Sequence, residues 1–245
     1  MSEREQVLLE DGFVLHQRPY RNSSQLLECM TAAHGRVGLV ARGSRRSPTR
    51  QRALLQPFVP LRLSWIRRGD LGRLTQVETS AAPLGLEGMN LLAGYYASEL
   101  LLRLTVRGDP NAEVFSCYSR CLAQLAERAG VARALRLYEL DLLRALGYAL
   151  ELDAEADTGR PLRRDSTYIF ELEAGARAVG NAGADDELYA GRELISLRER
   201  ELDDDAALRA AQRLLARALR AHLGDRPLRS RLVLQDIVSR HLVVQ

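Results

Sequence analysis

The hydrophobic residues of this chain repeat with one period before Pro83 and with another period after it. In the first 80 residues, apolar and polar side chains alternate in short runs, and Leu61, Leu63 and Trp65 form one such series. Residues two apart lie on the same face of a strand, so the alternation predicts β-strands. After Pro83 the apolar residues recur about every 3.6 positions, which is the period of a helix. The chain is therefore expected to be an α+β protein, with strands first and helices second.

Five short β-prone runs fall within the first part of the chain, over residues 7–15, 26–31, 36–42, 61–66 and 74–79. Turn-forming residues separate the runs, and this spacing fits a small barrel over residues 1–80. The stretch 43–52 is too polar, and too broken by Pro48, to be a core strand. It is expected to be a basic loop, with or without a short helix.

Residues 81–245 are predicted to form a helical domain, with helices over 90–106, 109–130, 131–150, 203–223 and 229–239. Asp109 and Pro110 have the residue types of a helix N-cap and first turn. An irregular insertion is expected near 151–185, where Tyr168 and Phe170 alternate as in one strand of a hairpin.

Positive charge is concentrated in the strand-rich part. Residues 1–80 contain 13 arginines and 7 acidic residues, a net charge of +6, whereas residues 81–245 have a net charge of −3. A basic surface on β-structure is typical of a nucleic-acid-binding protein. The predicted phosphate ligands are Arg36, Arg42, Arg45, Arg46, Arg50, Arg52, Arg67 and Arg68. The alternative is a solvated barrel face.

Aromatic residues near these arginines allow a second kind of contact. Trp65, Phe58 or Tyr20 could stack on bases, but Trp65 shares its parity with Leu61 and Leu63 and is more typical of a core residue. Without stacking, the protein is expected to bind mainly through charge, without reading base sequence, and to be very sensitive to salt.

Several classes of protein are excluded by what the sequence lacks. All 35 basic residues are arginine, so there is no lysine for a P-loop, a kinase-type ATP site or a pyridoxal phosphate Schiff base. No signal peptide and no transmembrane segment is expected, and three cysteines do not suggest a disulfide framework. No catalytic nucleophile with its base can be identified. We expect a cytoplasmic, non-enzymatic protein without a cofactor.

Six stretches of the sequence, in this order and spacing, resemble the RecO recombination mediators of bacteria. They are FVLHQRPYRNSS (13–24), HGRVGLVARGSRR (34–46), LLQPFVPL (54–61), YYASELL (95–101), LRLYELDLLRALGY (135–148) and GDRPLRSR (224–231). The resemblance covers nearly the whole chain. It implies an N-terminal five-stranded OB-type β-barrel followed by a C-terminal α-helical domain.

The resemblance also implies a function in DNA repair. RecO proteins bind single- and double-stranded DNA, anneal complementary strands, engage the acidic C-terminal tail of single-strand binding protein, and help to load RecA together with RecR. A nucleoid-associated location follows. Some members carry a four-cysteine zinc site, but no cysteine follows Cys121 here, so no metal is expected.

Arg136 is the candidate ligand for that acidic tail. It shares a helical row with Leu140 and Leu143, and a cation beside an apolar groove suits a peptide with acidic residues before a terminal Phe. The alternative is a surface pair between Arg136 and Glu139.

A second basic stripe is formed by Arg209, Arg213, Arg217 and Arg220. It is either a solvated helix face, or an extension of the DNA path or a landing site for an acidic peptide.

Two other functions fit the charge pattern. An RNA-binding OB-fold protein acting in translation or RNA turnover would bind the same phosphates. A protein-binding scaffold would present its basic face to an acidic partner. Competition between single-stranded DNA and structured RNA, and retention on single-stranded DNA, would distinguish them.

Overall fold

The computed structural model describes residues 4–44, 53–179, 187–224, 226–230 and 233. The chain divides into two compact units. Unit 1 contains Met1–Ala129 together with Pro227–Gln245, and unit 2 contains Gly130–Arg226. Unit 1 is therefore discontinuous in sequence, and each unit is described by itself.

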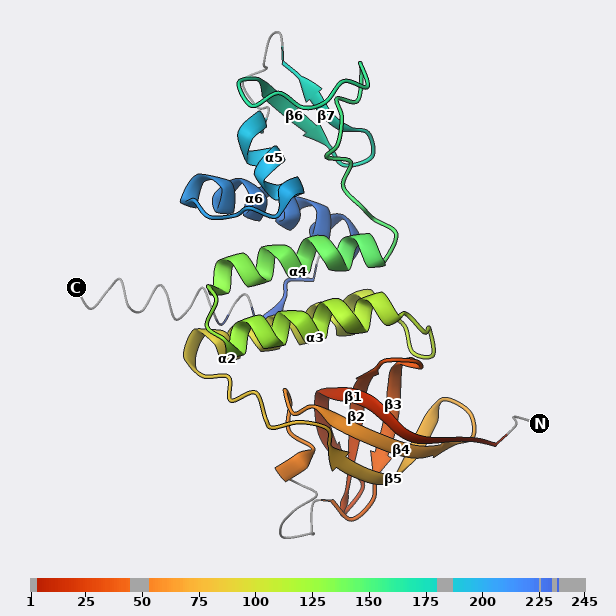
Figure 1. Ribbon diagram of the computed structural model, residues 1–245. Helices are drawn as coiled ribbons and strands as arrows, with labels where there is room; N and C mark the ends of the chain where they lie inside the picture. Colours follow the sequence, from red (N-terminus) through yellow and green to blue (C-terminus); the bar gives the residue numbers. More distant parts are fainter. Residues whose placement is uncertain (1–3, 45–52, 180–186, 225, 231–232, 234–245) are drawn as a thin grey trace. The chain divides into compact units, whose positions relative to one another are not determined.

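Unit 1 begins with a closed five-stranded barrel (Figure 1). Its strands are β1 (Glu5–Tyr20), β2 (Ser24–Thr31), β3 (Gly35–Ala41), β4 (Leu61–Arg67) and β5 (Leu71–Thr79). They pair in the order β1-β2-β3-β5-β4, and β1 closes the barrel by pairing with β4. All neighbours are antiparallel except β3 and β5. The five predicted strands and the barrel are confirmed.

Alternation along the strands fills the barrel interior. Leu61, Leu63 and Trp65 are buried in one core cluster with Leu27 and Leu39, whereas the intervening Arg62 is exposed. Gly72 makes room for this packing, because a Cβ there would lie 2.7 Å from a methyl carbon of Leu39. The side-chain period of two in the sequence thus becomes an apolar inside and a charged outside.

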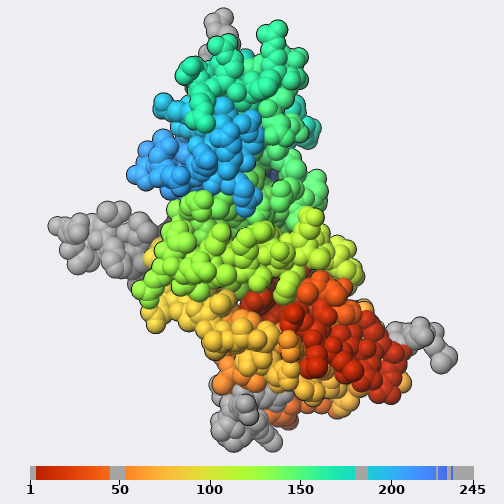
Figure 2. All heavy atoms as spheres, viewed as in Figure 1, coloured from red at the N-terminus to blue at the C-terminus, as the bar shows by residue number. Residues whose placement is uncertain are grey.

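Two helices pack against the barrel within unit 1, α2 (Gly88–Leu104) and α3 (Ala112–Ala126). Phe13 of β1 contacts the rings of Phe115 and Tyr118 on α3, and its ring lies edge-on to Tyr118 at 5.6 Å. The hydroxyl groups of Tyr118 and Ser98 are 2.8 Å apart and join α3 to α2. In Figure 2 the helices (yellow to yellow-green) and the first strands (red) form one closely packed surface.

The start of α3 differs from the prediction. Asp109 is not the N-cap; the cap is Asn111, whose side-chain oxygen accepts a hydrogen bond from the Val114 N–H at 3.1 Å. Asp109 and Pro110 belong instead to the connection between the helices, where the Asp109 carbonyl approaches Gly35 closely.

The end of the chain returns to unit 1. The carboxylate of Glu99 on α2 accepts hydrogen bonds from the backbone N–H groups of Arg229 and Ser230 and from the Ser230 hydroxyl, at 2.9, 2.9 and 2.7 Å. The predicted helix over 229–239 lies mostly outside the described residues.

Unit 2 contains three helices and a small sheet. The helices are α4 (Val131–Ala145), α5 (Gly191–Glu199) and α6 (Asp205–Leu223), and the strands β6 (Thr167–Glu171), β7 (Gly175–Ala178) and β8 (Leu188–Ala190) pair in the order β7-β6-β8. The predicted hairpin is confirmed, with Tyr168 and Phe170 buried. The predicted helix over 131–150 ends earlier, at Ala145, shortly before Gly147 with φ of 85°.

None of the helices in the described part of the chain is long and apolar enough to span a lipid bilayer.

Candidate nucleic-acid interface

Strand register places two exposed arginines on one outer surface of the barrel. Arg18 pairs with Leu26, Leu26 with Val40, and Val40 with Arg73, which makes one row across β1, β2, β3 and β5. Residues paired across a sheet share a face, and the neighbouring Leu39 is in the core, so this row lies on the side away from the barrel interior, where Leu26 is nevertheless buried and Val40 partly buried. Arg18 and Arg73 are both exposed. Three strand spacings separate them, about 14 Å.

Arg42 and Arg68 extend this exposed charge. Arg42 follows the end of β3, two residues after Val40, and Arg68 follows the end of β4. Both are exposed. Among the described residues, no carboxylate forms an ion pair with Arg18, Arg42, Arg68 or Arg73. Their charges are therefore available to a polyanion, and phosphate contact stays a prediction for Arg42 and Arg68.

Four of the predicted ligands, Arg45, Arg46, Arg50 and Arg52, lie outside the described residues. The last described residue before them is Ser44, which is buried and whose hydroxyl donates to the Ala41 carbonyl at 3.0 Å.

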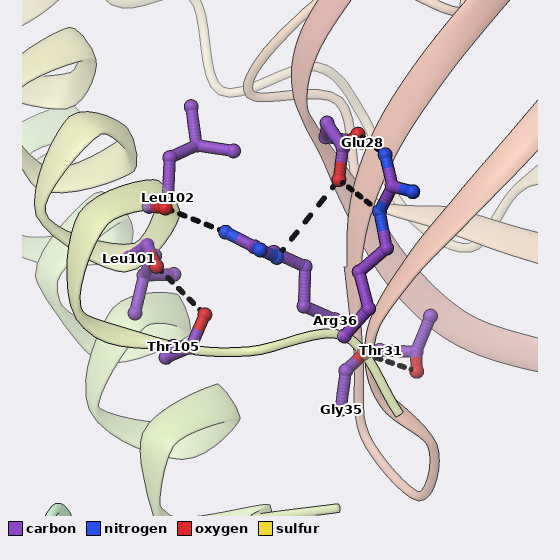
Figure 3. Close-up of polar contacts among 8 residues, drawn as sticks. Glu28, Thr31, Gly35, Arg36, Leu101, Leu102 and Thr105 are labelled. Carbon is purple, nitrogen blue, oxygen red and sulfur yellow. Dashed lines mark hydrogen bonds and ion pairs between the residues drawn. The ribbon is translucent and has the colours of Figure 1, made fainter. Parts of the chain in front are cut away.

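Arg36 has a different role from the predicted one (Figure 3). Its Nη1 donates to the Leu102 carbonyl near the end of α2 at 2.6 Å, and its Nε lies 3.9 Å from the Glu28 carboxylate. Only 16% of its side chain is exposed. Because its guanidinium group holds α2 on the barrel, Arg36 is a weaker candidate phosphate ligand than the exposed arginines, and its DNA contact stays a prediction.

Glu28 joins two arginines at this position. Arg107, which follows α2, donates to both Glu28 oxygens through Nε and Nη2. Burial lowers the pKa of Arg36, the Glu28 charge raises it and the Arg107 charge lowers it further, with a net downward shift. For Arg107 the hydrogen bond that it donates to Glu28 dominates over burial, and the net pKa is raised. The carboxylate thus makes two neighbouring cations compatible with partial burial.

Two further barrel arginines are paired. Arg67 donates to Glu5 through Nε and Nη2, at 2.9 and 2.7 Å. Arg62 lies 3.6 Å from Asp11 and 4.0 Å from Glu78. Arg67 is therefore a weaker candidate phosphate ligand than Arg42 or Arg68, because a phosphate would have to share it with Glu5.

The aromatic residues do not offer a stacking surface. Trp65 is 1% exposed and Phe58 is 5% exposed, and the Phe58 ring packs edge-on against Tyr95 at 5.1 Å. Tyr20 is partly exposed, but the guanidinium of Arg21 already covers its ring at 5.4 Å. The surface is thus suited to phosphates rather than bases.

The candidate peptide site lies on α4 in unit 2. Leu143 is completely buried, so the structure gives no support to its predicted contact with a peptide, which stays a prediction. Arg136 lies 2.5 Å from Glu139 and forms the pair that was the alternative to peptide binding. Its Nε is nevertheless buried without a hydrogen-bond acceptor among the described residues, and Leu140 remains partly exposed.

The stripe on α6 is largely used within unit 2. Arg213 and Arg217 both pair with Glu187, at 3.2 and 3.4 Å, and both lie over the Tyr189 ring. Arg217 also donates to the Phe170 carbonyl. These contacts attach α6 to the small sheet, so they do not support a continuous free stripe.

Two residues of the exposed row, Arg18 and Arg73, were not among the predicted ligands. Arg73 stands between the buried Gly72 and Leu74, and this alternation already indicated an outward side chain. Arg18 had no such signal, because only the pairing with Leu26 places it in the row.

Comparisons with known proteins agree with this architecture. Residues 6–83 match the family model described as Recombination protein O N terminal, and residues 87–232 match that described as Recombination protein O C terminal. A protein named DNA repair protein RecO from Nitrosococcus oceani is 43% identical over 231 residues, 94% of each chain. Proteins of that name from Methylococcus capsulatus and Haemophilus influenzae are 40% and 38% identical; the first alignment covers 92% of each chain, the second 91% of this chain and 94% of the relative.

Proposed function

Because the chain belongs to the RecO family of DNA repair proteins, we propose that its barrel binds single- and double-stranded DNA through backbone phosphates and that it anneals complementary strands. The observation that supports this most strongly is the group of exposed arginines at positions 18, 42, 68 and 73, which have no carboxylate partner among the described residues. Guanidinium groups without a carboxylate partner bind phosphate, and because Trp65 and Phe58 are buried they cannot stack on bases.

Annealing follows from the same charges. Two complementary strands repel each other through their phosphates, and a cationic surface lowers this repulsion while it raises their local concentration. No bond is made or broken, so we propose a non-enzymatic mediator. We also propose that the protein helps to load RecA, together with RecR, on DNA covered by single-strand binding protein.

The acidic tail of single-strand binding protein is proposed to bind unit 2 beside Arg136 and Leu140. The partly exposed Leu140 beside the Arg136 cation supports this assignment, although Arg136 is also paired with Glu139. A labelled peptide copy of that tail should bind the protein, and Arg136→Gln should weaken its binding. Equal binding by the variant would remove Arg136 from the site.

The DNA contact is tested by a salt titration. The double variant Arg18→Gln/Arg73→Gln should bind a single-stranded oligonucleotide less tightly, and its log–log salt slope should fall by about 1.4, because each phosphate contact on single strands contributes about 0.7. The matched control is Arg62→Gln, whose charge is already paired with Asp11 and Glu78. An unchanged slope in the double variant would refute the proposed surface.

Annealing is measured on the same proteins, with complementary oligonucleotides and no nucleotide. The wild type should accelerate annealing, and the double variant should do so less. Structured RNA that displaces DNA from the wild type more effectively than DNA itself would point to an RNA-binding protein instead.

A further inference from the structure

A cavity in unit 1 brings together three segments that are distant in sequence. Its volume is about 850 Å³, and it is lined by the start of β1, the β4–β5 turn and the residues after α2. The charged lining residues are Arg4, Glu5, Arg67, Asp70 and Arg107. Three guanidinium groups at one cavity are suited to phosphate or carboxylate, which they bind through forked hydrogen bonds.

Two of these guanidinium groups are held in place. Glu5 accepts from Nε and Nη2 of Arg67, and Glu28 accepts from the same two atoms of Arg107. Each carboxylate occupies one edge of its arginine and leaves the Nη1 end for another acceptor. A side chain that is already oriented loses less conformational freedom when a ligand arrives.

The other residues that line the cavity leave room for a ligand. Arg4 is exposed, and the wall between the charged groups is formed by Gly69 and Gly108, which carry no side chain. Arg68, which precedes Gly69 in the sequence, is exposed and is not part of the lining.

The carboxylates in the wall favour one kind of phosphate. Glu5, Asp70 and Glu28 together balance the three guanidinium groups, so binding here depends on the number of hydrogen bonds that a phosphate can accept rather than on net charge. A terminal phosphomonoester carries nearly two charges and three acceptor oxygens, enough for several guanidinium groups. The same carboxylates repel the next phosphate of a strand that continues through the cavity.

We propose that this cavity binds the terminal phosphomonoester of a nucleic-acid strand. The inference rests on the proposed DNA-binding function and adds a preference for strand ends to it. The barrel arginines hold the strand, and the cavity holds its phosphorylated end.

The test compares one oligonucleotide in three forms: with a 5′-phosphate, with a 3′-phosphate and with hydroxyl groups at both ends. One phosphorylated form should bind about fivefold more tightly than the hydroxyl form, the gain expected from an added exposed charge pair. The form with the advantage identifies which end enters the cavity.

Arg4→Gln and Arg67→Gln should each reduce this advantage. Arg67 and Glu5 form a partly exposed pair that contributes little to stability, so the second variant is expected to fold, and Arg4 has no partner to lose among the described residues. Arg18→Gln, outside the cavity, should weaken all three forms equally and leave the advantage intact.

Equal binding of the three forms by the wild type would overturn the cavity proposal while leaving DNA binding in place. Failure of every form to bind would instead refute the proposed function. An advantage that survives in both cavity variants would place the end-binding site elsewhere.

Discussion

Replacing Arg36 tests whether this arginine stabilises the fold or binds DNA. Arg36→Met keeps the aliphatic part of the side chain and removes the hydrogen bond to the Leu102 carbonyl, 2.6 Å long, and the contact with Glu28. A hydrogen bond from a charged group contributes about 1.5–3 kcal/mol. Glu28 keeps its stronger partner, Arg107, so no unpaired carboxylate is created. We expect the free energy of unfolding to fall by about 2 kcal/mol.

The assay uses a reporter that the protein already contains. Trp65 is the single tryptophan of the chain and lies in the barrel core, so its fluorescence during urea unfolding reports on unit 1. The matched control is Arg42→Met, at an exposed position without an ion pair among the described residues. The control should unfold within about 0.5 kcal/mol of the wild type, as surface substitutions usually do.

The two variants should differ in the opposite way in their affinity for DNA. Arg42→Met should bind single-stranded DNA more weakly, whereas Arg36→Met should bind it as the wild type does under conditions where it is folded. If Arg36→Met is as stable as the wild type and loses as much DNA affinity as Arg42→Met, then Arg36 is a phosphate ligand and the structural reasoning is refuted.

Three further predictions concern stability. Burial raises the pKa of Glu99, but the hydrogen bonds from Ser230 and its neighbour outweigh burial and the net pKa is lowered. The stability that this carboxylate contributes is thus present at neutral pH and is lost as the pH falls through its folded-state pKa. Glu99→Gln should therefore flatten the acid side of a plot of Tm against pH. An unchanged plot would contradict this. Gly35→Ala should lower the yield of folded protein and its Tm, because a Cβ would lie 2.0 Å from a backbone oxygen at a φ of 62°; a wild-type Tm would show that the connection can move. Asp141 and Arg200 form two hydrogen bonds of 2.7 and 2.8 Å, so a double-mutant cycle with Asp141→Asn and Arg200→Met should give a coupling energy of about 1–3 kcal/mol, and a value near zero would contradict the pairing.

The fold could be predicted from sequence because its signals are local. The alternation of Leu61, Leu63 and Trp65 is a period that any strand with one buried face must show, and the barrel follows from five such runs. The start of α3 was harder, because Asp109 and Asn111 are both good N-cap residues and the sequence does not distinguish them; in the structure Asn111 is the cap and Asp109 lies next to Gly35.

The site was predicted less well because charge pairing is not local. Arg36 and Arg42 are equivalent cations in the sequence, but Arg36 meets Leu102 from a distant helix whereas Arg42 meets no acid among the described residues. Arg67 likewise finds Glu5 at the other end of the barrel sequence. The sequence could therefore predict that the excess of positive charge lies on the barrel. It could not predict which of the arginines are left without a carboxylate partner.

The division of unit 1 into two stretches of chain has a consequence for synthesis. As the polypeptide leaves the ribosome, the barrel and its two helices emerge first, but the Glu99 carboxylate must wait for Ser230, more than a hundred residues later. Until then α2 exposes an acidic side chain without its final hydrogen-bond donors. A product truncated before residue 227 would therefore contain the barrel, α2 and α3 but would lack Arg229 and Ser230, the donors to the Glu99 carboxylate.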